Sequence, residues 1–254
     1  SEICIRDRER QMRKICSVLF AAVLILGICV SAQAAFTFDD IEYWVGTGSN
    51  RAALVIDWND GKNPQSLAWG YRWDGTAYGA DMLMAIAGSG YIKDAYEDST
   101  PNEYLSGDDS RLYACISDWG WGGITGYTVF GLGYDLDGDG GDFVSGYEDV
   151  DHETGYATDS DDHYKEGWYT GYWSYWLSDA ADPWQAADWE YSGLGMGSRV
   201  LSDGDWDGWS FVQPACYGCG EPPSEPVPAV PEPATVVLLA LGGIALLIRR
   251  RRVD

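Results

Sequence analysis

Residues 68–73 read AWGYRW, and this stretch decides the fold of the chain. Small or polar residues alternate in it with Trp69, Tyr71 and Trp73, so a β-strand would carry all three rings on one face. Rings of this size bury large areas and drive the formation of a core. An Asp-Gly turn signal at residues 74–75 ends the stretch. The sequence therefore predicts a strand whose aromatic face packs into the centre of a β-rich domain.

Much of the surrounding chain has the same character. Runs rich in β-branched and aromatic residues, separated by glycine-rich turns, predict further strands at residues 51–58, 111–117, 124–134, 168–177 and 209–212. Two short helices are expected, one over residues 81–87 and one over residues 183–189 after an N-capping Asp182. Several strands and two helices predict a mainly β or α+β fold, formed by a single aromatic-rich globular domain over residues 35–220.

The charge of the chain is strongly negative and unevenly spread. Its 254 residues include 40 Asp and Glu against 16 Lys and Arg. Between residues 35 and 230, 35 acidic residues stand against seven basic ones. A field of this sign repels nucleic acid and anionic lipid, so we expect neither as a partner. All 13 Trp and 17 Tyr also lie in this part, and such an aromatic content excludes a disordered acidic chain.

The N-terminal residues have the three parts of a secretory signal peptide. Arg13 and Lys14 follow Met12, an apolar run covers residues 15–30, and a small-residue cleavage sequence ends at Ala34. We expect residues 1–34 to be a signal peptide with some upstream residues, and cleavage to follow Ala34. A buried N-terminal helix is the alternative interpretation.

The C-terminal part carries a second apolar segment. Residues 221–230 are proline-rich and predict a linker, and residues 234–248 are apolar. A helix of fifteen residues spans about 22 Å, less than the hydrocarbon core of about 30 Å. The positive-inside rule predicts a cytoplasmic end for the basic cluster that follows directly, Arg249, Arg250, Arg251 and Arg252. The segment thus predicts a short transmembrane helix that holds the chain to the membrane before processing.

The motif Pro231, Glu232 and Pro233, the apolar segment and the closing arginines together resemble the PEP-CTERM sorting signal. The resemblance is confined to residues 231–254. It implies export by a Gram-negative bacterium to the cell envelope, the cell surface or the extracellular matrix. It also implies processing of the tail near the motif by an exosortase, a membrane-embedded cysteine protease-transpeptidase. The physical features agree, because prolines begin a helix well and leave the motif exposed at the membrane face.

The acidic stretch at residues 135–140 reads DLDGDG. Carboxylates at loop positions 1, 3 and 5 with a glycine at position 6 match the front half of an EF-hand loop, whose oxygen ligands converge on calcium. Position 12 is Gly146 instead of Glu, so the back half does not match. The expected calcium ligands are Asp135, Asp137, Asp139 and Asp142. The alternative is a solvated acidic turn that binds no metal.

The chain has only two histidines, His152 and His163. His163 lies in the acidic stretch 159–164, which could add metal ligands. A histidine beside several carboxylates is, however, more typical of a surface or structural residue.

Three cysteines lie outside the expected signal peptide. Cys216 and Cys219 form a C-x-x-C sequence followed by glycine and prolines, where a thioredoxin-type motif would open a helix. Zinc would need four ligands, and the chain has one C-x-x-C. Because an exported protein can keep disulfides, a bond between Cys216 and Cys219 is expected. Pairing of Cys115 with one of them is the main alternative.

The aromatic pairs of the expected strand 168–177 occupy both of its faces. One face must be core. The other either packs at the edge of the core or stacks on sugar rings or a planar ligand, and Trp173 and Trp176 are the candidates for stacking.

A second resemblance involves the same part of the chain. The helix at 81–87, GYWSYW at 171–176 and VLSDGD at 200–205 are together similar to the β-grasp-like C-terminal domain of the transcobalamin and intrinsic-factor type. This resemblance implies binding of a small, corrinoid-like ligand.

No catalytic signature stands out, since the chain contains no G-x-S-x-G, H-E-x-x-H or phosphate-binding glycine loop. The leading hypothesis is therefore a non-enzymatic protein of the envelope or extracellular matrix that interacts with exopolysaccharide. A small-ligand or glycan-binding module is the second hypothesis, and an extracellular hydrolase is a distant third. Calcium is the only cofactor that the sequence suggests.

Overall fold

The computed structural model describes residues 35–88, 91–92, 109–121, 124–138, 143–144, 155–167, 171–214, 216 and 218–229. The predicted signal peptide and the predicted transmembrane helix lie outside these residues. Within the described ranges, no helix has both the length and the apolar character needed to cross a membrane.

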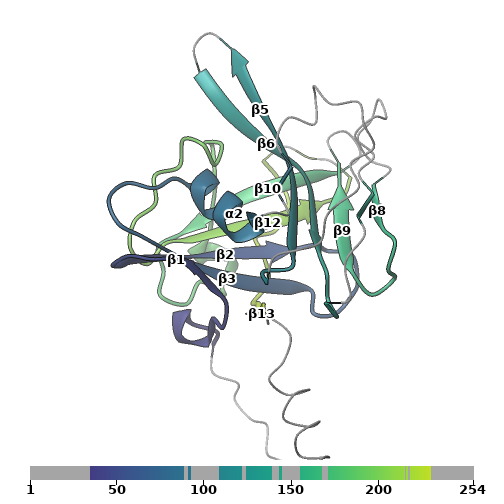
Figure 1. Cartoon of the computed structure of the whole chain (residues 1–254), viewed down its shortest axis with the longest axis horizontal. Coiled ribbons are helices and arrows are strands. Elements are labelled where there is room, and N and C mark those ends of the chain that lie inside the picture. The colour runs from purple at the N-terminus through teal and green to yellow at the C-terminus, as the bar shows by residue number, and fades with distance from the viewer. Residues whose placement is uncertain are drawn as a thin grey trace, which may run out of the picture. The chain divides into compact units, whose positions relative to one another are not determined.

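The domain is mainly β, as predicted (Figure 1). Over the described residues its helical elements are η1 (Phe38–Asp40), α2 (Gly79–Ala87) and η3 (Ala186–Asp188). Its strands are β1 (Trp44–Gly46), β2 (Asn50–Asp57), β3 (Ser66–Trp73), β4 (Tyr91–Ile92), β5 (Leu112–Trp121), β6 (Ile124–Tyr134), β7 (Phe143–Val144), β8 (Tyr156–Ala157), β9 (His163–Glu166), β10 (Tyr172–Ser178), β11 (Glu190–Tyr191), β12 (Trp206–Val212) and β13 (Val227–Pro228).

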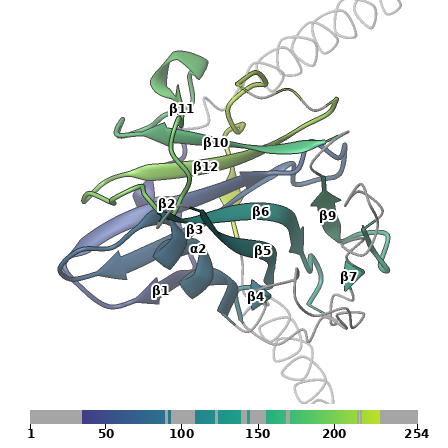
Figure 2. The same ribbon diagram turned by 90° about the horizontal axis from the view of Figure 1, so that it is seen from above.

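The largest sheet has seven strands in the order β1-β3-β2-β12-β10-β11, with β13 also on β3. β2 and β3 are antiparallel along their whole length, whereas β2 and β12 are parallel. The parallel pair places β12 at the centre of the sheet, with β10 antiparallel beside it (Figure 2).

Strand β2 has apolar side chains on both of its faces, and both faces of the sheet are covered there. Leu54 and Ile56 face a first apolar cluster, and Ala53 and Val55 face a second one, all at most 1% exposed. An unbroken apolar run is typical of a strand that is buried on both sides. The first face packs against α2 and the second sheet, and the other face is covered by the segment around η1 and by aromatic residues near η3.

Helix α2 forms where the sequence predicted it, with its inner face closed by Met82, Leu83 and Ile86 at 0 to 1% exposure. Its N-terminus is fixed by Asp81, whose Oδ2 accepts a hydrogen bond from the Tyr78 amide at 2.8 Å. The helix expected at residues 183–189 is shorter and reduces to the 3₁₀ turn η3.

The second sheet has the order β4-β5-β6-β9. β5 and β6 form a long antiparallel pair with an irregularity between Cys115 and Ile116. Leu112 and Leu132 of this sheet join the first apolar cluster, so the core lies between the two sheets. The short strand β9 pairs with the end of β6, and β7 and β8 form a separate pair.

The proline-rich stretch expected as a linker packs against the domain over its described residues. β13 adds to β3 in parallel. Ser224 donates from its amide and its hydroxyl to Asp57 Oδ2, at 2.9 and 2.7 Å, and Ala229 is 1% exposed. The chain is therefore held to the large sheet as far as residue 229.

Candidate functional site

The acidic turn after β6 brings two of the predicted calcium ligands close to a third carboxylate. Asp135, Asp137 and Asp162 each offer one oxygen, and these three atoms lie within 4.8 Å of one another. The other two predicted ligands, Asp139 and Asp142, lie outside the described residues. Asp162 was not among the predicted ligands. It reaches the turn because β9, which follows it directly, pairs with the end of β6.

Hydrogen bonds hold the backbone of this turn in place. Asp135 Oδ1 accepts from the amide of Gly138 at 2.6 Å, and the φ angle of 78° at Gly138 suits a residue without a Cβ. The Arg111 guanidinium donates to the Leu136 carbonyl at 2.9 Å, and the Leu136 amide donates to Asp162 Oδ1, also at 2.9 Å. The turn and the Asp162 side chain are thus fixed to each other.

The electrostatic setting of Asp162 is unfavourable for a bare carboxylate. Its side chain is 0% exposed, and burial raises its pKa to about 6 against the lowering effect of the Leu136 amide. The charges of Asp135, Asp159 and Asp137 contribute to this rise in pKa. Among the described residues, its second oxygen Oδ2 has no hydrogen-bond partner.

His163, next to Asp162, has a structural setting. Its ring stacks on Trp58 with centroids 4.7 Å apart, and its Nδ1 lies 2.9 Å from Asp60 Oδ2. Burial alone would raise the pKa of Asp60, but hydrogen bonds from His163 and from the Lys62 amide bring that pKa below its ordinary value. The Lys62 ammonium donates to the carbonyl of Asp162. These contacts anchor the segment before β9 against the large sheet.

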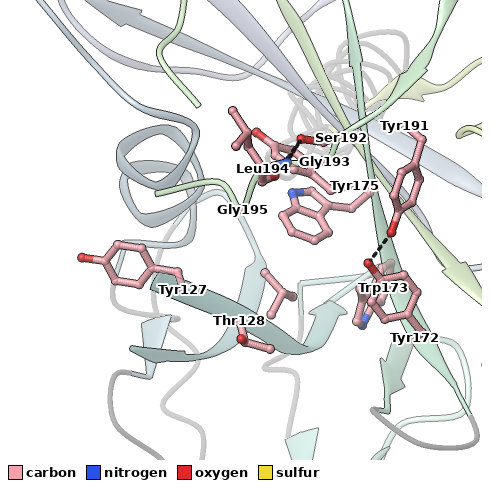
Figure 3. A pocket seen from close by; sticks show the side chains of 12 residues that line it. Tyr127, Thr128, Tyr172, Trp173, Tyr175, Tyr191, Ser192, Gly193, Leu194 and Gly195 are labelled. Carbon is pink, nitrogen blue, oxygen red and sulfur yellow. Dashed lines mark hydrogen bonds between the residues drawn. The ribbon is translucent and has the colours of Figure 1, made fainter. Parts of the chain in front are cut away.

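A second candidate site is an open cavity of about 320 Å³ between β6, β10 and the segment after β11 (Figure 3). Aromatic rings and small or hydroxyl-bearing residues make up its lining: Tyr127, Thr128, Val129, Tyr172, Trp173, Tyr175, Tyr191, Ser192, Gly193, Leu194, Gly195 and Trp209. No Asp, Glu, Lys or Arg is among these residues.

Two tyrosines form one wall of the cavity. The hydroxyl groups of Tyr172 and Tyr191 are 2.8 Å apart and hydrogen-bonded, and both side chains are half-buried (Figure 3). On the other side, the ring of Tyr127 covers the backbone of Gly197, where a Cβ would lie 2.6 Å from that ring. The segment that closes the cavity is tied to β10 by a bond from the Ser192 amide to the Tyr175 carbonyl at 2.8 Å.

The structure places the two predicted stacking residues on different faces of the large sheet. Trp173 lines the cavity but is 2% exposed, and its Nε1 donates to the Lys165 carbonyl at 3.3 Å. Trp176 packs on the second apolar cluster and donates to Ser174 Oγ at 2.9 Å. The two rings therefore do not form one platform, and the more accessible rings of the cavity are tyrosines that the sequence did not single out.

A buried polar cluster lies beneath the cavity. The Tyr175 hydroxyl donates to Asp207 Oδ2, and Arg199 Nε donates to Asp207 Oδ1 at 3.4 Å. Arg199 also pairs with Asp205 at 2.7 Å. Burial raises the pKa of Asp207 to about 6, against the hydrogen bond from Tyr175 and the charge of Arg199. Burial also raises the pKa of Tyr175 well above its ordinary value, so Tyr175 stays a donor.

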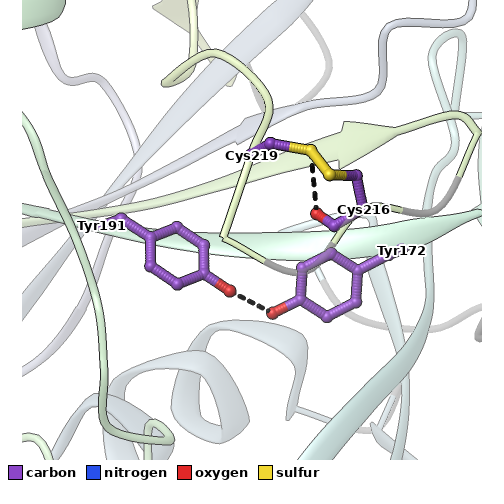
Figure 4. Close-up of a disulfide and its surroundings, with 4 residues drawn as sticks. All are labelled: Tyr172, Tyr191, Cys216 and Cys219. Atoms are coloured by element: carbon purple, nitrogen blue, oxygen red, sulfur yellow. Dashed lines mark hydrogen bonds between the residues drawn. A yellow bond between two sulfur atoms is a disulfide. The ribbon is translucent and has the colours of Figure 1, made fainter.

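The sulfur atoms of Cys216 and Cys219 are joined in the structure, in a loop that follows β12 (Figure 4). Figure 4 also shows Tyr172 and Tyr191, the hydrogen-bonded tyrosines of the cavity, in the surroundings of the disulfide. Strand β12, which precedes the disulfide loop, ends at Val212, and Val212 is the strand partner of Tyr172. Cys115 is buried among the aromatic rings of a third apolar cluster and takes no part in this disulfide.

We predict that this disulfide is present in the exported protein. Alkylation of unfolded protein should label two more cysteines after reduction than before it, because only reduction releases Cys216 and Cys219. The double variant Cys216→Ser/Cys219→Ser is the matched control and should show no such increase. Equal labelling of the wild-type protein with and without reductant would contradict the prediction.

Comparison with known proteins identifies the C-terminal tail. Residues 229–252 match the PEP-CTERM protein-sorting motif. This motif marks an exported protein that is sorted to the cell envelope or surface and processed by an exosortase. No curated protein and no solved structure matches the chain. The resemblance of the body to the transcobalamin and intrinsic-factor type accordingly has no support.

Proposed function

We propose that the chain is a non-enzymatic protein of the bacterial envelope or extracellular matrix whose domain binds exopolysaccharide in the aromatic cavity. The observation that carries the proposal is the lining of this cavity, which combines accessible tyrosine rings with hydroxyl groups and open glycine backbone. The sorting motif supports the proposal, because an exported domain can meet a polymer outside the cell.

The chemistry of the lining suits a sugar. The C–H groups on one face of a pyranose pack on aromatic rings, while its hydroxyl groups need donors and acceptors at the edge of the ring. Tyr172 and Tyr191 offer both, since each ring is half-buried and their hydroxyl groups point at one another. Thr128 and Ser192 add further hydroxyl groups to the lining.

The negative charge of the domain disfavours binding of anionic polysaccharides. Residues 35–230 carry 35 acidic and seven basic side chains, which repel an anionic polysaccharide. The cavity lining holds no charged side chain that could pair with a sulfate, phosphate or uronate group. The proposed ligand is therefore a neutral glycan.

We expect Tyr172→Ala and Tyr191→Ala each to weaken binding of a neutral exopolysaccharide by about fivefold, because an aromatic contact contributes about 1 kcal/mol beyond its buried area. The measurement is affinity electrophoresis of the exported protein in gels that contain the polymer. Tyr156→Ala is the matched control, since Tyr156 is 56% exposed on β8 and does not line the cavity.

Retention of wild-type mobility by both cavity variants would contradict the proposed binding site. A wild-type protein that is not retarded by any neutral polymer of its host would contradict the proposed function itself.

We also predict that the mature surface protein lacks its tail. Exosortase processing near Pro231 would separate the domain from the apolar segment and the basic cluster. Mass spectrometry of surface-exposed protein should therefore find peptides of the domain and none from residues 238–254. A strain without the exosortase is the control and should retain these peptides. Their recovery from mature protein of an exosortase-bearing host would contradict the prediction.

A further inference from the structure

We propose that Asp135, Asp137 and Asp162 bind one calcium ion, which ties the turn after β6 to the segment before β9. The site differs from the EF-hand-like loop that the sequence suggests, because one ligand comes from a separate segment. The inference is independent of glycan binding and concerns a different part of the domain.

The setting of Asp162 favours a bound cation. Its side chain is 0% exposed and its Oδ1 accepts a hydrogen bond from Leu136. Its Oδ2 is buried and has no hydrogen-bond partner among the described residues. A buried carboxylate oxygen with no partner is costly, and proteins usually compensate it with a donor or a metal ion. One oxygen of the same carboxylate lies within 4.8 Å of a carboxylate oxygen of Asp135 and of Asp137.

Two neighbouring cations bind the backbone around the three carboxylates. The Lys62 ammonium donates to the main-chain carbonyl of Asp162, and Arg111 donates to the carbonyl of Leu136. Both bonds hold the backbone in place.

The spacing of the three oxygens suits a single calcium ion. Calcium binds oxygen at about 2.3–2.6 Å, so two ligands on opposite sides of the ion lie about 5 Å apart. The three candidate oxygens lie within 4.8 Å of one another and can therefore reach a single calcium ion. Magnesium needs shorter bonds of about 2.0–2.1 Å in strict octahedral geometry. Asp137 is exposed, so water can complete the coordination from the solvent side.

Calcium in this position would strengthen a short connection in the fold. β9 pairs with β6 only between Gly131–Tyr134 and His163–Glu166, and the three carboxylates stand at the end of this pairing. Without a cation the carboxylates repel each other. With calcium bound, the ion joins both chain segments, so the folded state binds the ion and the unfolded state does not.

The test is a thermal unfolding curve of the exported protein in chelator and in 5 mM calcium, together with calorimetric titration of the metal alone. Extracellular calcium sites have dissociation constants of about 10⁻⁴ to 10⁻³ M. We expect one bound calcium per chain and a rise in Tm of about 5 °C, with a smaller rise in magnesium.

Two variants locate the site and one serves as the control. Asp162→Asn and Asp137→Asn should lose the calcium-dependent rise in Tm, and Asp162→Asn should be at least as stable as the wild-type protein in chelator, because a buried charge is removed. Asp161→Asn makes the same chemical change at the adjacent exposed residue and should keep the full rise. Asp137 is exposed, so its variant tests the site without disturbing the core.

Several outcomes would overturn the proposal. One is a wild-type protein whose Tm does not respond to millimolar calcium. Another is an equal response in the wild-type protein and both site variants, which would assign the effect to general screening of the acidic surface. A loss of response in Asp161→Asn as large as that in Asp162→Asn would have the same meaning.

Discussion

Trp58→Ala is expected to lower the free energy of unfolding by about 3–5 kcal/mol, the range found when a large buried aromatic side chain is removed from a core. Trp58 directly follows β2 and is 0% exposed. Domains of this kind are stable by only about 5–15 kcal/mol, so the variant should lose a large part of its total stability.

The expected loss of stability is large because Trp58 contacts both sheets. Its ring contacts Trp69 of the large sheet and Tyr134 of the second sheet, with centroids 6.4 and 6.2 Å away. Its Nε1 donates to the Leu132 carbonyl at 2.8 Å, and its face stacks on His163. Alanine would leave a cavity between the sheets and also remove a donor from a buried carbonyl, and these losses add.

Urea unfolding followed by far-ultraviolet circular dichroism would measure the loss. Trp58→Phe keeps a ring but no donor, so it should cost less than the alanine variant. Leu194→Ala is the control, because Leu194 is 60% exposed and its replacement should change stability by no more than about 0.5 kcal/mol. A cost below about 1 kcal/mol for Trp58→Ala would mean that Trp58 does not join the two sheets.

The fold class and most long strands could be predicted because their side-chain pattern is local. The alternation of residues 68–73 places Trp69 and Trp73 in the core at 0 and 5% exposure, as the pattern indicates. The apolar run at residues 51–58 likewise becomes a strand that is buried on both faces. In these strands the burial of each side chain follows from its position in the sequence.

Short strands could not be predicted in this way. β13 consists of Val227 and Pro228 in a proline-rich stretch, which local propensity assigns to a linker. It forms because the exposed edge of β3 offers backbone partners beyond the end of β1. β9 has the sequence HYKE and is defined by its pairing with β6. The stabilisation of both strands comes from distant parts of the chain.

At η3 the expected helix is shortened, because side-chain packing in the core outweighs the local preference for a helix. The Asp182-Pro183 pair is a good start for a helix, but Trp184 and Trp189 both turn into the second apolar cluster. Trp184 Nε1 also donates to the Phe36 carbonyl at 2.6 Å. Between these two indoles the chain forms only the three-residue turn η3.

Two of the three ligands of the candidate calcium site could be predicted from the sequence, because only these two are close to each other along the chain. The spacing of Asp135 and Asp137 is a local signal for oxygen ligands. Asp162 lies 26 residues beyond Leu136, to which it is hydrogen-bonded, and only the pairing of β6 with β9 brings it there. The cavity could not be predicted from the sequence, because its walls come from three separate segments: β6, β10 and the segment after β11.

In the wild-type protein, the buried carboxylate of Asp207 is expected to lower the free energy of unfolding by about 3 kcal/mol as the pH rises from 4 to 7. The variant Asp207→Asn should lack this contribution. Asp207 is 1% exposed and sits between the Tyr175 hydroxyl and Arg199, with Asp205 sharing the same guanidinium. Burial raises its pKa to about 6, and this effect outweighs the hydrogen bond from Tyr175 and the charge of Arg199. The ordinary pKa of an aspartate is about 3.9, which applies in the unfolded chain.

The sign of the effect follows from proton binding. Between pH 4 and pH 6 the folded state holds a proton on Asp207 that the unfolded state has already released. Stability therefore falls as the pH rises through this window, and the loss is complete above the folded-state pKa. A shift of about two pKa units corresponds to about 3 kcal/mol. Below pH 4 the residue is protonated in both states and makes no difference.

The measurement is the free energy of unfolding in urea at pH 4, 5, 6 and 7 for the wild-type protein and Asp207→Asn. Other carboxylates titrate in both proteins, so the informative quantity is the difference between them. Wild-type stability should decline relative to the variant by about 3 kcal/mol from pH 4 to pH 7. The exposed Asp182→Asn provides the control and should track the wild-type protein at every pH. A difference between wild type and Asp207→Asn that is constant with pH would mean that Arg199 and Tyr175 fully compensate the buried charge.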